Sequence, residues 1–390
     1  MDFWLSKEEC CGCTACKNAC PVKAIEFQKS EEGFKYPDIN TEKCVNCGKC
    51  KSVCPVYNKK NLGHLRANIF NRGITRVFSA YNKDDEIRYM SASGGVFSAV
   101  AAYFLNNNGV VFGAAYEKTT VKHTYITQIS ELDKLRGTKY VQSEIGDSYS
   151  VVRDYLQNGI QVLWVGTPCQ VAGLYEFLGK DHENLTTIEI ICMGVNSPEI
   201  FQKWLKEIEQ ENKKKIQKVH MRYKDNGWRD SASSIRIDFT DGTYIVRRGK
   251  INYYMKGFLD GRLYLRESCY NCSFKGDSRS ADLIMGDFWG IEGDDNKGMS
   301  VIMVNSLKGS SVLAKVGDDL NLKEQRLEDI VKNNPGFSIS EPRNEKRDAF
   351  FQYIQKESLE KAIKRVLPNK NFFYKVNRKI KKVYKHIDGK

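Results

Sequence analysis

CCGCTACKNACP, residues 10–21, places five of the chain's thirteen cysteines within eleven positions. Four of them follow the spacing C-x2-C-x2-C-x3-C, with a proline directly after the last: Cys10, Cys13, Cys16 and Cys20. CVNCGKCKSVCP, residues 44–55, repeats this spacing 34 positions later, with Cys44, Cys47, Cys50 and Cys54. The constant offset indicates an internal duplication of a metal-binding unit.

The spacing predicts how these eight cysteines are shared between two cubic iron–sulfur clusters. In each run the first three cysteines wrap around one face of a cluster, and the fourth ligates the cluster of the other run. One [4Fe–4S] cluster is therefore expected on Cys10, Cys13, Cys16 and Cys54. The other is expected on Cys44, Cys47, Cys50 and Cys20. Cys11 falls at a spacer position, where the second run has Val45, and we expect no ligand role for it.

The segment between the two runs supports this interpretation. Residues 24–44, AIEFQKSEEGFKYPDINTEKC, read as two short strands around a Glu-Glu-Gly turn. With this hairpin, residues 1–60 resemble two-cluster ferredoxins over their whole length. A pair of zinc knuckles is disfavoured, because zinc sites usually pair two C-x2-C units across a longer loop. A module of this kind transfers single electrons and performs no chemistry on an organic substrate.

Composition limits the classes of protein to which the chain can belong. Its 390 residues are 41% hydrophobic and 28% charged, which suits a globular protein with two or three domains. No stretch approaches the about eighteen consecutive apolar residues of a membrane span. The opening MDFWLSKEEC lacks the apolar region of a secretory signal. We expect a cytoplasmic protein, in which regularly spaced cysteines are more often metal ligands or redox groups than disulfides.

The net charge of +13 is concentrated at the end of the chain. Residues 356–390 hold twelve Lys and Arg against three Asp and Glu, and so account for nine of these charges. A basic amphipathic helix is predicted there from apolar residues spaced by three and four: Phe373, Val376, Ile380, Val383 and Ile387. Such a helix suits an anionic membrane surface, an acidic redox partner, or packing on its own domain. Nucleic-acid binding is disfavoured, since the charge is confined to the tail.

The rest of the chain divides into a linker, a body and this tail. Residues 61–75 are polar and read as a linker, whereas 76–340 alternate strand-like and helix-like segments. Period-two alternation around an Asp-Gly turn within 223–248 adds an antiparallel part. We therefore expect a mixed α/β body, followed by a basic helical tail over 341–390.

Two loops of this body and four remaining cysteines are candidates for chemistry. SASGG, residues 91–95, opens a helix and suits an anion, although a glycine turn before a core helix has the same pattern. GTPCQ, residues 166–170, lies at the carboxyl end of a buried strand, where α/β sheets bind ligands. The remaining cysteines suggest either a third cluster or a zinc site, with Cys192 also readable as core: Cys169, Cys192, Cys269 and Cys272.

Five segments in order resemble the coenzyme F420 hydrogenase/dehydrogenase beta subunit family over about 76–340. They are SASGGVFSAVAAYFL, RGTKYVQSEIG, VLWVGTPCQVAGL, ICMGVNSPEIFQKWL and LRESCYNCSFKGDSRSADLIMGDFWG. The resemblance implies a body that binds FAD, and a [4Fe–4S] cluster on the four remaining cysteines. It implies FAD contacts by Ser91, Ser93, Gly94, Gly95, Lys139, Tyr140, Gly166, Thr167 and Pro168. The segment DFWG, residues 287–290, is also expected at the flavin.

The expected protein is an α+β ferredoxin-like domain joined to an α/β flavin-binding body. The expected function is that of an iron–sulfur flavoprotein oxidoreductase, with a redox protein partner and a small-molecule hydride donor or acceptor. The alternative is a flavin-free electron-transfer subunit. Met193 and Asn196 stand where relatives more often have His and Pro, so coenzyme F420 need not be the substrate. No acid–base pair stands out, because all five histidines lie in polar contexts and are expected at the surface: His64, His123, His182, His220 and His386.

Overall fold

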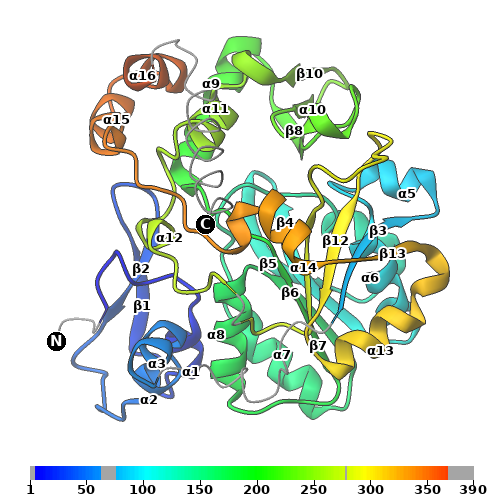
Figure 1. Cartoon of the computed structure of the whole chain (residues 1–390). Helices are drawn as coiled ribbons and strands as arrows, with labels where there is room; N and C mark the ends of the chain where they lie inside the picture. The colour runs from blue at the N-terminus through cyan, green and yellow to red at the C-terminus, as the bar shows by residue number, and fades with distance from the viewer. Residues whose placement is uncertain (1–4, 63–75, 277–278, 368–390) are drawn as a thin grey trace, which may run out of the picture.

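The computed structural model describes residues 5–62, 76–276 and 279–367. Figure 1 shows a small N-terminal segment, in blue, beside a larger body built on a twisted sheet. A second group of helices and a small sheet lies above that sheet in the same view. The predicted amphipathic helix over 373–387 and most of the predicted linker fall outside the described residues.

The N-terminal segment consists of one antiparallel hairpin and three short helices. They are α1 (Ala15–Ala19), β1 (Ile25–Lys29), β2 (Lys35–Ile39), α2 (Lys49–Ser52) and α3 (Pro55–Leu62). In the hairpin, Ile25 lies opposite Ile39 and Lys29 opposite Lys35, so the turn falls at the Glu-Glu-Gly stretch as the sequence predicts. Proline at the start of α3 needs no amide hydrogen there, which suits the first position of a helix.

The central sheet has eight strands in the order β13-β3-β12-β11-β7-β6-β4-β5. The strands are β3 (Arg76–Asn82), β4 (Val110–Glu117), β5 (Thr120–Ile126), β6 (Val162–Gly166), β7 (Leu185–Ile190), β11 (Leu283–Asp287), β12 (Ser300–Val304) and β13 (Leu320–Gln325). The four inner strands β4, β6, β7 and β11 run parallel, while the outer pairings are antiparallel. The predicted mixed α/β architecture is therefore confirmed.

Helices cover the faces of this sheet and supply its core. They are α5 (Asp85–Met90), α6 (Val96–Asn106), α7 (Ser148–Gln157), α8 (Pro168–Leu178), α13 (Leu307–Lys315) and α14 (Leu327–Asn333), with the 3-10 helices η1 (Ile129–Lys134), η3 (Gly317–Asp319) and η4 (Pro335–Phe337). The apolar face of α6, which includes Val100 and Phe104, packs on Leu163 and Ile188 of the buried inner strands. Strands buried on both faces explain the near-continuous apolar runs of the sequence.

A second core lies between a three-stranded antiparallel sheet and the helices beside it. The strands are β8 (Ile216–Met221), β9 (Ile235–Phe239) and β10 (Tyr244–Arg247). The helices are α9 (Pro198–Asn212), α10 (Trp228–Ser231), α11 (Tyr253–Leu259), α15 (Arg347–Ile354) and α16 (Leu359–Val366), with η2 (Gly249–Ile251) beside them. Phe350 and Ile363 are fully buried in this core. Part of the segment predicted as a tail is therefore packed into the body.

The N-terminal segment packs directly on α8, which lies between it and the central sheet (Figure 1). Gly173 of α8 permits the approach, because a Cβ atom there would lie 2.9 Å from both Cβ and Sγ of Cys13. On the other side, Arg347 of α15 donates hydrogen bonds to Glu32 in the β1–β2 turn. In the described ranges, no helix is long and apolar enough to cross a bilayer.

Candidate redox site

The structure brings together the first predicted set of cluster ligands. Cys10, Cys13 and Cys16 are buried, as is Cys54 from the second run. Burial raises the pKa of Cys16 well above its usual range, and the neighbouring thiols of Cys10 and Cys54 raise it further. Four thiols in a dry setting become stable thiolates only beside a cation, so this donor set fits an iron–sulfur cluster.

The second predicted set is far more open. Cys47 is exposed, and Cys20, Cys44 and Cys50 are half-buried. Cys50 has its pKa raised by burial and then by the thiols of Cys47 and Cys20. The fourth cysteine of the first run thus lies beside the second run, as the predicted exchange of ligands requires. Cys44 donates a hydrogen bond to Asn46, with its sulfur 3.7 Å from Oδ1.

The four body cysteines converge on one small cavity. Its wall includes Cys11 together with Cys169, Cys192, Cys269 and Cys272. Burial raises the pKa of Cys192 to about 12, with Lys275 opposing the rise, and burial also raises the pKa of Cys269. Among the described residues, no three His, Cys, Asp or Glu side chains lie close enough together to hold a single metal ion.

Cations lie around this cavity. Lys275 donates hydrogen bonds to the carbonyl oxygens of Cys192 and Gly336. Arg279 forms an ion pair of 3.1 Å with Glu189, and both side chains are buried. Both cations line the cavity or its edge and compensate negative charge there, which suits four thiolates around a cluster.

A larger cavity of about 460 Å³ adjoins the first one. Seven of the nine predicted cofactor contacts line it: Ser91, Ser93, Gly95, Lys139, Tyr140, Gly166 and Thr167. Gly94 instead faces β3, where a Cβ atom would lie 2.4 Å from the carbonyl oxygen of Ala80. Pro168 lines the smaller cavity. Asp287 and Trp289 of the GDFWG segment line the larger one, whose volume suits an organic cofactor.

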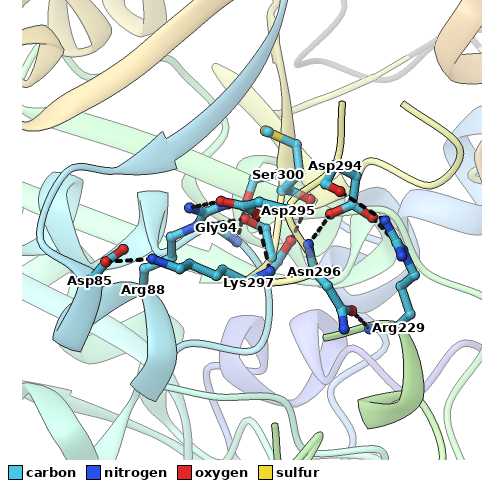
Figure 2. A network of polar contacts seen from close by, with 12 residues as sticks. Asp85, Arg88, Gly94, Arg229, Asp294, Asp295, Asn296, Lys297 and Ser300 are labelled. Carbon is cyan, nitrogen blue, oxygen red and sulfur yellow. Dashed lines mark hydrogen bonds and ion pairs between the residues drawn. The ribbon is translucent and has the colours of Figure 1, made fainter. Parts of the chain in front are cut away.

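A network of ion pairs holds the 91–95 loop in place (Figure 2). Arg88 donates two hydrogen bonds to Asp295, at 2.7 and 2.8 Å, and Lys297 pairs with Asp85 at 2.6 Å. The amide of Gly94 donates to Ser300 Oγ at 2.9 Å. Because the loop is tied to β12 and to the segment before it, its backbone forms a fixed wall of the larger cavity.

Lys139 lies in the wall of the cavity and binds the turn that follows η1. Its ammonium group donates hydrogen bonds to the carbonyl oxygens of Leu135, Arg136 and Gly137, at 2.9 to 3.2 Å. Burial lowers the pKa of Lys139 to about 7, and the charge of Lys218 adds to this. Lys139 therefore positions the turn at 135–138, which forms one side of the cavity.

His123 lies in the wall of the larger cavity, so its predicted surface position is wrong. Its ring stacks on Trp164, with centroids 4.9 Å apart. Nε2 donates to the carbonyl oxygen of Val165 at 3.0 Å, and Nδ1 accepts from Ser143 Oγ at 2.8 Å. Burial lowers the pKa of His123 to about 4, so the ring is neutral. His123 lies two residues after the buried Val121 in β5, and this period of two is the sequence signal that could have indicated its inward position.

The two departures from the family pattern also lie at this site. Met193 lines both cavities. Asn196 is fully buried and donates a hydrogen bond of 2.9 Å to the carbonyl oxygen of Tyr140. Asn196 therefore fixes the backbone at Tyr140 and hence the position of the cavity wall.

The two cavities share part of their walls. Six residues line both of them: Thr167, Gln170, Cys192, Met193, Gly194 and Val195. Thr167 and Gln170 come from the start of α8, where they form a reciprocal cap. The other four follow β7 directly. A single layer of protein thus separates the thiol cavity from the larger one.

Comparison with known proteins places the chain in a family. The family model described as coenzyme F420 hydrogenase/dehydrogenase, beta subunit N-term, matches residues 77–148, and its C-terminus model matches 160–330. A 4Fe-4S dicluster domain matches residues 9–58. No curated protein matches the chain.

Among solved structures, the chain is similar to one from the xenon-derivatised F420-reducing [NiFe] hydrogenase complex of Methanosarcina barkeri. The identity is 16%, the TM-score is 0.45, and the match covers 75% of this chain and 89% of that one. The two halves of one family model, which together span more than half of the sequence, are the stronger finding. The chain belongs to the coenzyme F420 hydrogenase/dehydrogenase beta subunit family and is an iron–sulfur oxidoreductase-type subunit with a 4Fe-4S dicluster domain.

Proposed function

We propose that this chain is an iron–sulfur flavoprotein oxidoreductase in which three [4Fe–4S] clusters and one FAD exchange electrons. The observation that carries the proposal is the shared wall between the two cavities, which includes the consecutive residues 192–195. A cluster in the smaller cavity and a flavin in the larger one would be separated by that layer alone. Electron transfer between cofactors needs such proximity.

The clusters are assigned to three sets of cysteines. Two sets are those of the N-terminal runs: Cys10, Cys13, Cys16 and Cys54, and Cys44, Cys47, Cys50 and Cys20. The third set is Cys169, Cys192, Cys269 and Cys272. The raised thiol pKa values in the first and third sets favour ligation to iron over free thiolates.

The larger cavity is assigned to FAD. When bound, a flavin supplies the conversion between two-electron hydride exchange and single-electron transfer. The chain contributes the amides at the start of α6, where Gly95 precedes the helix and no side chain caps it. Such amides favour a phosphate group. Phe258, Met285 and Trp289 give the cavity apolar walls that exclude water.

A protein partner and a small molecule complete the proposed reaction. The exposed second run offers a place where a redox protein can deliver or accept single electrons. The larger cavity offers a place for a hydride donor or acceptor. None of the thirteen cysteines, all of which lie in the described ranges, forms a disulfide, which suits a reducing compartment such as the cytoplasm.

The first test is cofactor content in protein purified without oxygen. Flavin released by acid should equal about one FAD per chain, with about twelve irons and as many acid-labile sulfides, because each cubane holds four. About eight irons and no flavin would contradict the proposal. That result would identify a flavin-free electron-transfer subunit with two N-terminal clusters.

A cavity-filling variant tests the position of the flavin. Gly113 lines the larger cavity, and a Cβ atom there would have only ordinary contacts with Leu135, the nearest at 3.6 Å. Gly113→Leu should reduce bound FAD severalfold and leave the iron content unchanged. Gly317→Leu is the matched control, since its Cβ would have a single neighbour at 4.0 Å and lies outside both cavities. Equal flavin in both variants would place the flavin elsewhere.

A further inference from the structure

Arg266 is a buried cation at the junction between the N-terminal segment and the body. It directly precedes α12 (Glu267–Tyr270), and only 1% of its surface is exposed. Its guanidinium donates hydrogen bonds to the carbonyl oxygens of Cys10 at 2.7 Å and Lys35 at 3.0 Å. A further hydrogen bond of 3.0 Å reaches Gln142 Oε1. The site is thus formed by residues from both parts of the molecule.

The negative partner expected of such a cation is not a carboxylate. Among the described residues, Arg266 forms no ion pair with Asp or Glu, whereas the buried Arg279 pairs with Glu189 and the buried Arg347 pairs with Glu32 and Glu267. Instead, Nη2 lies 3.8 Å from Cys10 Sγ. The groups whose negative charge would stabilise Arg266 are, in order, Cys10, Tyr36, Cys11 and Cys269.

Aromatic rings fix the guanidinium in this position. It lies over Tyr36 at 4.2 Å and over Phe34 at 5.6 Å from the ring centroids. Gly12 leaves room for it, because a Cβ atom there would lie 2.9 Å from the guanidinium carbon. The guanidinium therefore cannot swing away from Cys10 without displacing several side chains.

An unpaired buried charge destabilises a fold, so this arrangement needs a compensating charge. Cys10 and Cys269 belong to two different proposed clusters. A cluster held by four thiolates is negative and becomes more negative when it accepts an electron. A fixed cation nearby stabilises the reduced form and raises the reduction potential, and this effect is strong where water is excluded.

We propose that Arg266 is a positioning residue that raises the reduction potential of the cluster held by Cys10, Cys13, Cys16 and Cys54. The inference rests on the proposed function, because it uses that assignment of clusters. With a cluster at each set, one electron from a redox partner would move downhill from the exposed second-run site to the first-run site. Cys269 of the body set is a weaker partner of the same cation than Cys10, so the effect of Arg266 should be largest at the first-run site.

Cys11 marks the path between the first-run cluster and the body cluster. Its thiol neighbours those of Cys13 and Cys169, which belong to the two proposed clusters. Gln142, a partner of Arg266, also donates to the carbonyl oxygen of Cys11 at 3.3 Å. The cluster whose reduction potential Arg266 raises is therefore the N-terminal cluster that adjoins the body.

The test is a redox titration of the whole protein, purified without oxygen and followed by electron paramagnetic resonance. Arg266→Gln should lower the potential of one N-terminal cluster so that its reduced-to-oxidised ratio falls at least tenfold, or about 59 mV for one electron. Cys47→Ser removes a ligand of the second-run cluster and Cys272→Ser one of the body cluster, so the signal that both variants keep is that of the first-run cluster. The second-run cluster should keep its potential, since its first ligand Cys44 lies half-exposed beside Asn46.

Arg347→Gln is the matched control, because it removes a second buried arginine that bonds the N-terminal hairpin but touches no thiol. It should leave all potentials unchanged. Arg266→Lys, which keeps the charge, should shift the potential less than Arg266→Gln. Arg266→Met serves as a second neutral variant if the glutamine variant does not fold. Equal shifts in Arg266→Gln and Arg347→Gln, or no shift in either neutral variant, would overturn the inference.

Iron and flavin content separate this inference from the proposed function. A wild-type protein with fewer than three clusters would show that the proposed function is wrong before any titration. Full cofactor content with unchanged potentials in the Arg266 variants would leave the proposed function intact and refute the role of Arg266.

Discussion

The two cysteine runs share one spacing but occupy opposite environments. Cys10, Cys13 and Cys16 are buried against the body, and α1 packs on α8. In the second run, Cys47 is exposed, Val45 is 61% exposed, and α2 has no buried residue. The spacing indicates what each run binds, whereas the surroundings decide whether it faces the body or solvent.

The backbone of the two runs is nevertheless the same. Gly12 and its counterpart Asn46 have φ angles of 71° and 52°, and Thr14 and its counterpart Gly48 have 62° and 70°. These four residues all adopt the left-handed conformation, which glycine and asparagine tolerate best. The ligand loop has therefore kept its shape while its outer face has changed.

The largest difference between the runs should follow loss of one ligand. Cys13→Ser and Cys47→Ser should each remove about four of about twelve irons, because each breaks one cubane site. Cys13→Ser should also stop electron transfer to the body and lower the melting temperature, since Cys13 packs on Gly173 of α8. Cys47→Ser should leave the melting temperature nearly unchanged. Iron analysis and thermal unfolding check this prediction. Equal melting temperatures for the two variants would show that the two runs do not differ in their packing.

Exchange of the two left-handed residues should give a smaller effect. Gly12→Asn introduces a Cβ atom 2.9 Å from the Arg266 guanidinium and should destabilise the fold by about 1–3 kcal/mol. Asn46→Gly has no such neighbour to displace and should change the free energy of unfolding by less than about 0.5 kcal/mol. Urea unfolding measures both. Similar values for the two variants would show that the runs do not differ in packing.

Metal removal should distinguish the runs by rate. A hydrophilic iron chelator should remove about a third of the iron in a fast phase, because only the second-run site is exposed. Cys47→Ser should abolish that fast phase and leave the slow one. A single phase in the wild-type protein would mean that both sites are equally accessible.

The smallest effect is expected at an exposed side chain. Val45→Ser should change stability by less than about 0.5 kcal/mol, yet raise the KM for a protein electron donor a few fold. The matched control is Val22→Ser, since Val22 is 38% exposed and follows the first run. Activity with a small-molecule dye at the flavin site should stay constant in both. An equal rise in KM at Val22 would place the partner elsewhere.

The sequence was sufficient to predict the mixed α/β sheet, the hairpin and the loops around the larger cavity. These depend on local patterns: alternating strands and helices, a Glu-Glu-Gly turn, and small residues at strand ends. The sequence of the two runs could not predict which run is buried, because Cys13 and Cys47 occupy identical positions in the motif. That difference arises from contacts with α8, more than a hundred residues away.

Long-range contacts explain the other differences. Arg266 is a single arginine in LRESC, and nothing beside it predicts that it reaches Cys10. His123 has polar neighbours in sequence, yet β5 turns it toward Trp164. The predicted tail contains α15 and α16, whose apolar faces share a core with α9 and α11, more than a hundred residues earlier in the case of α9.

The contact between Arg266 and Cys10 spans 256 residues, which has a consequence for biosynthesis. The first cysteine run leaves the ribosome long before the residues that enclose it. Both runs are synthesised early and could close on each other, since in the proposed assignment each lends a ligand to the other. The first run can be fully enclosed only after Arg266 has been translated. Completion of that site should therefore be a late step in the folding of the newly synthesised chain.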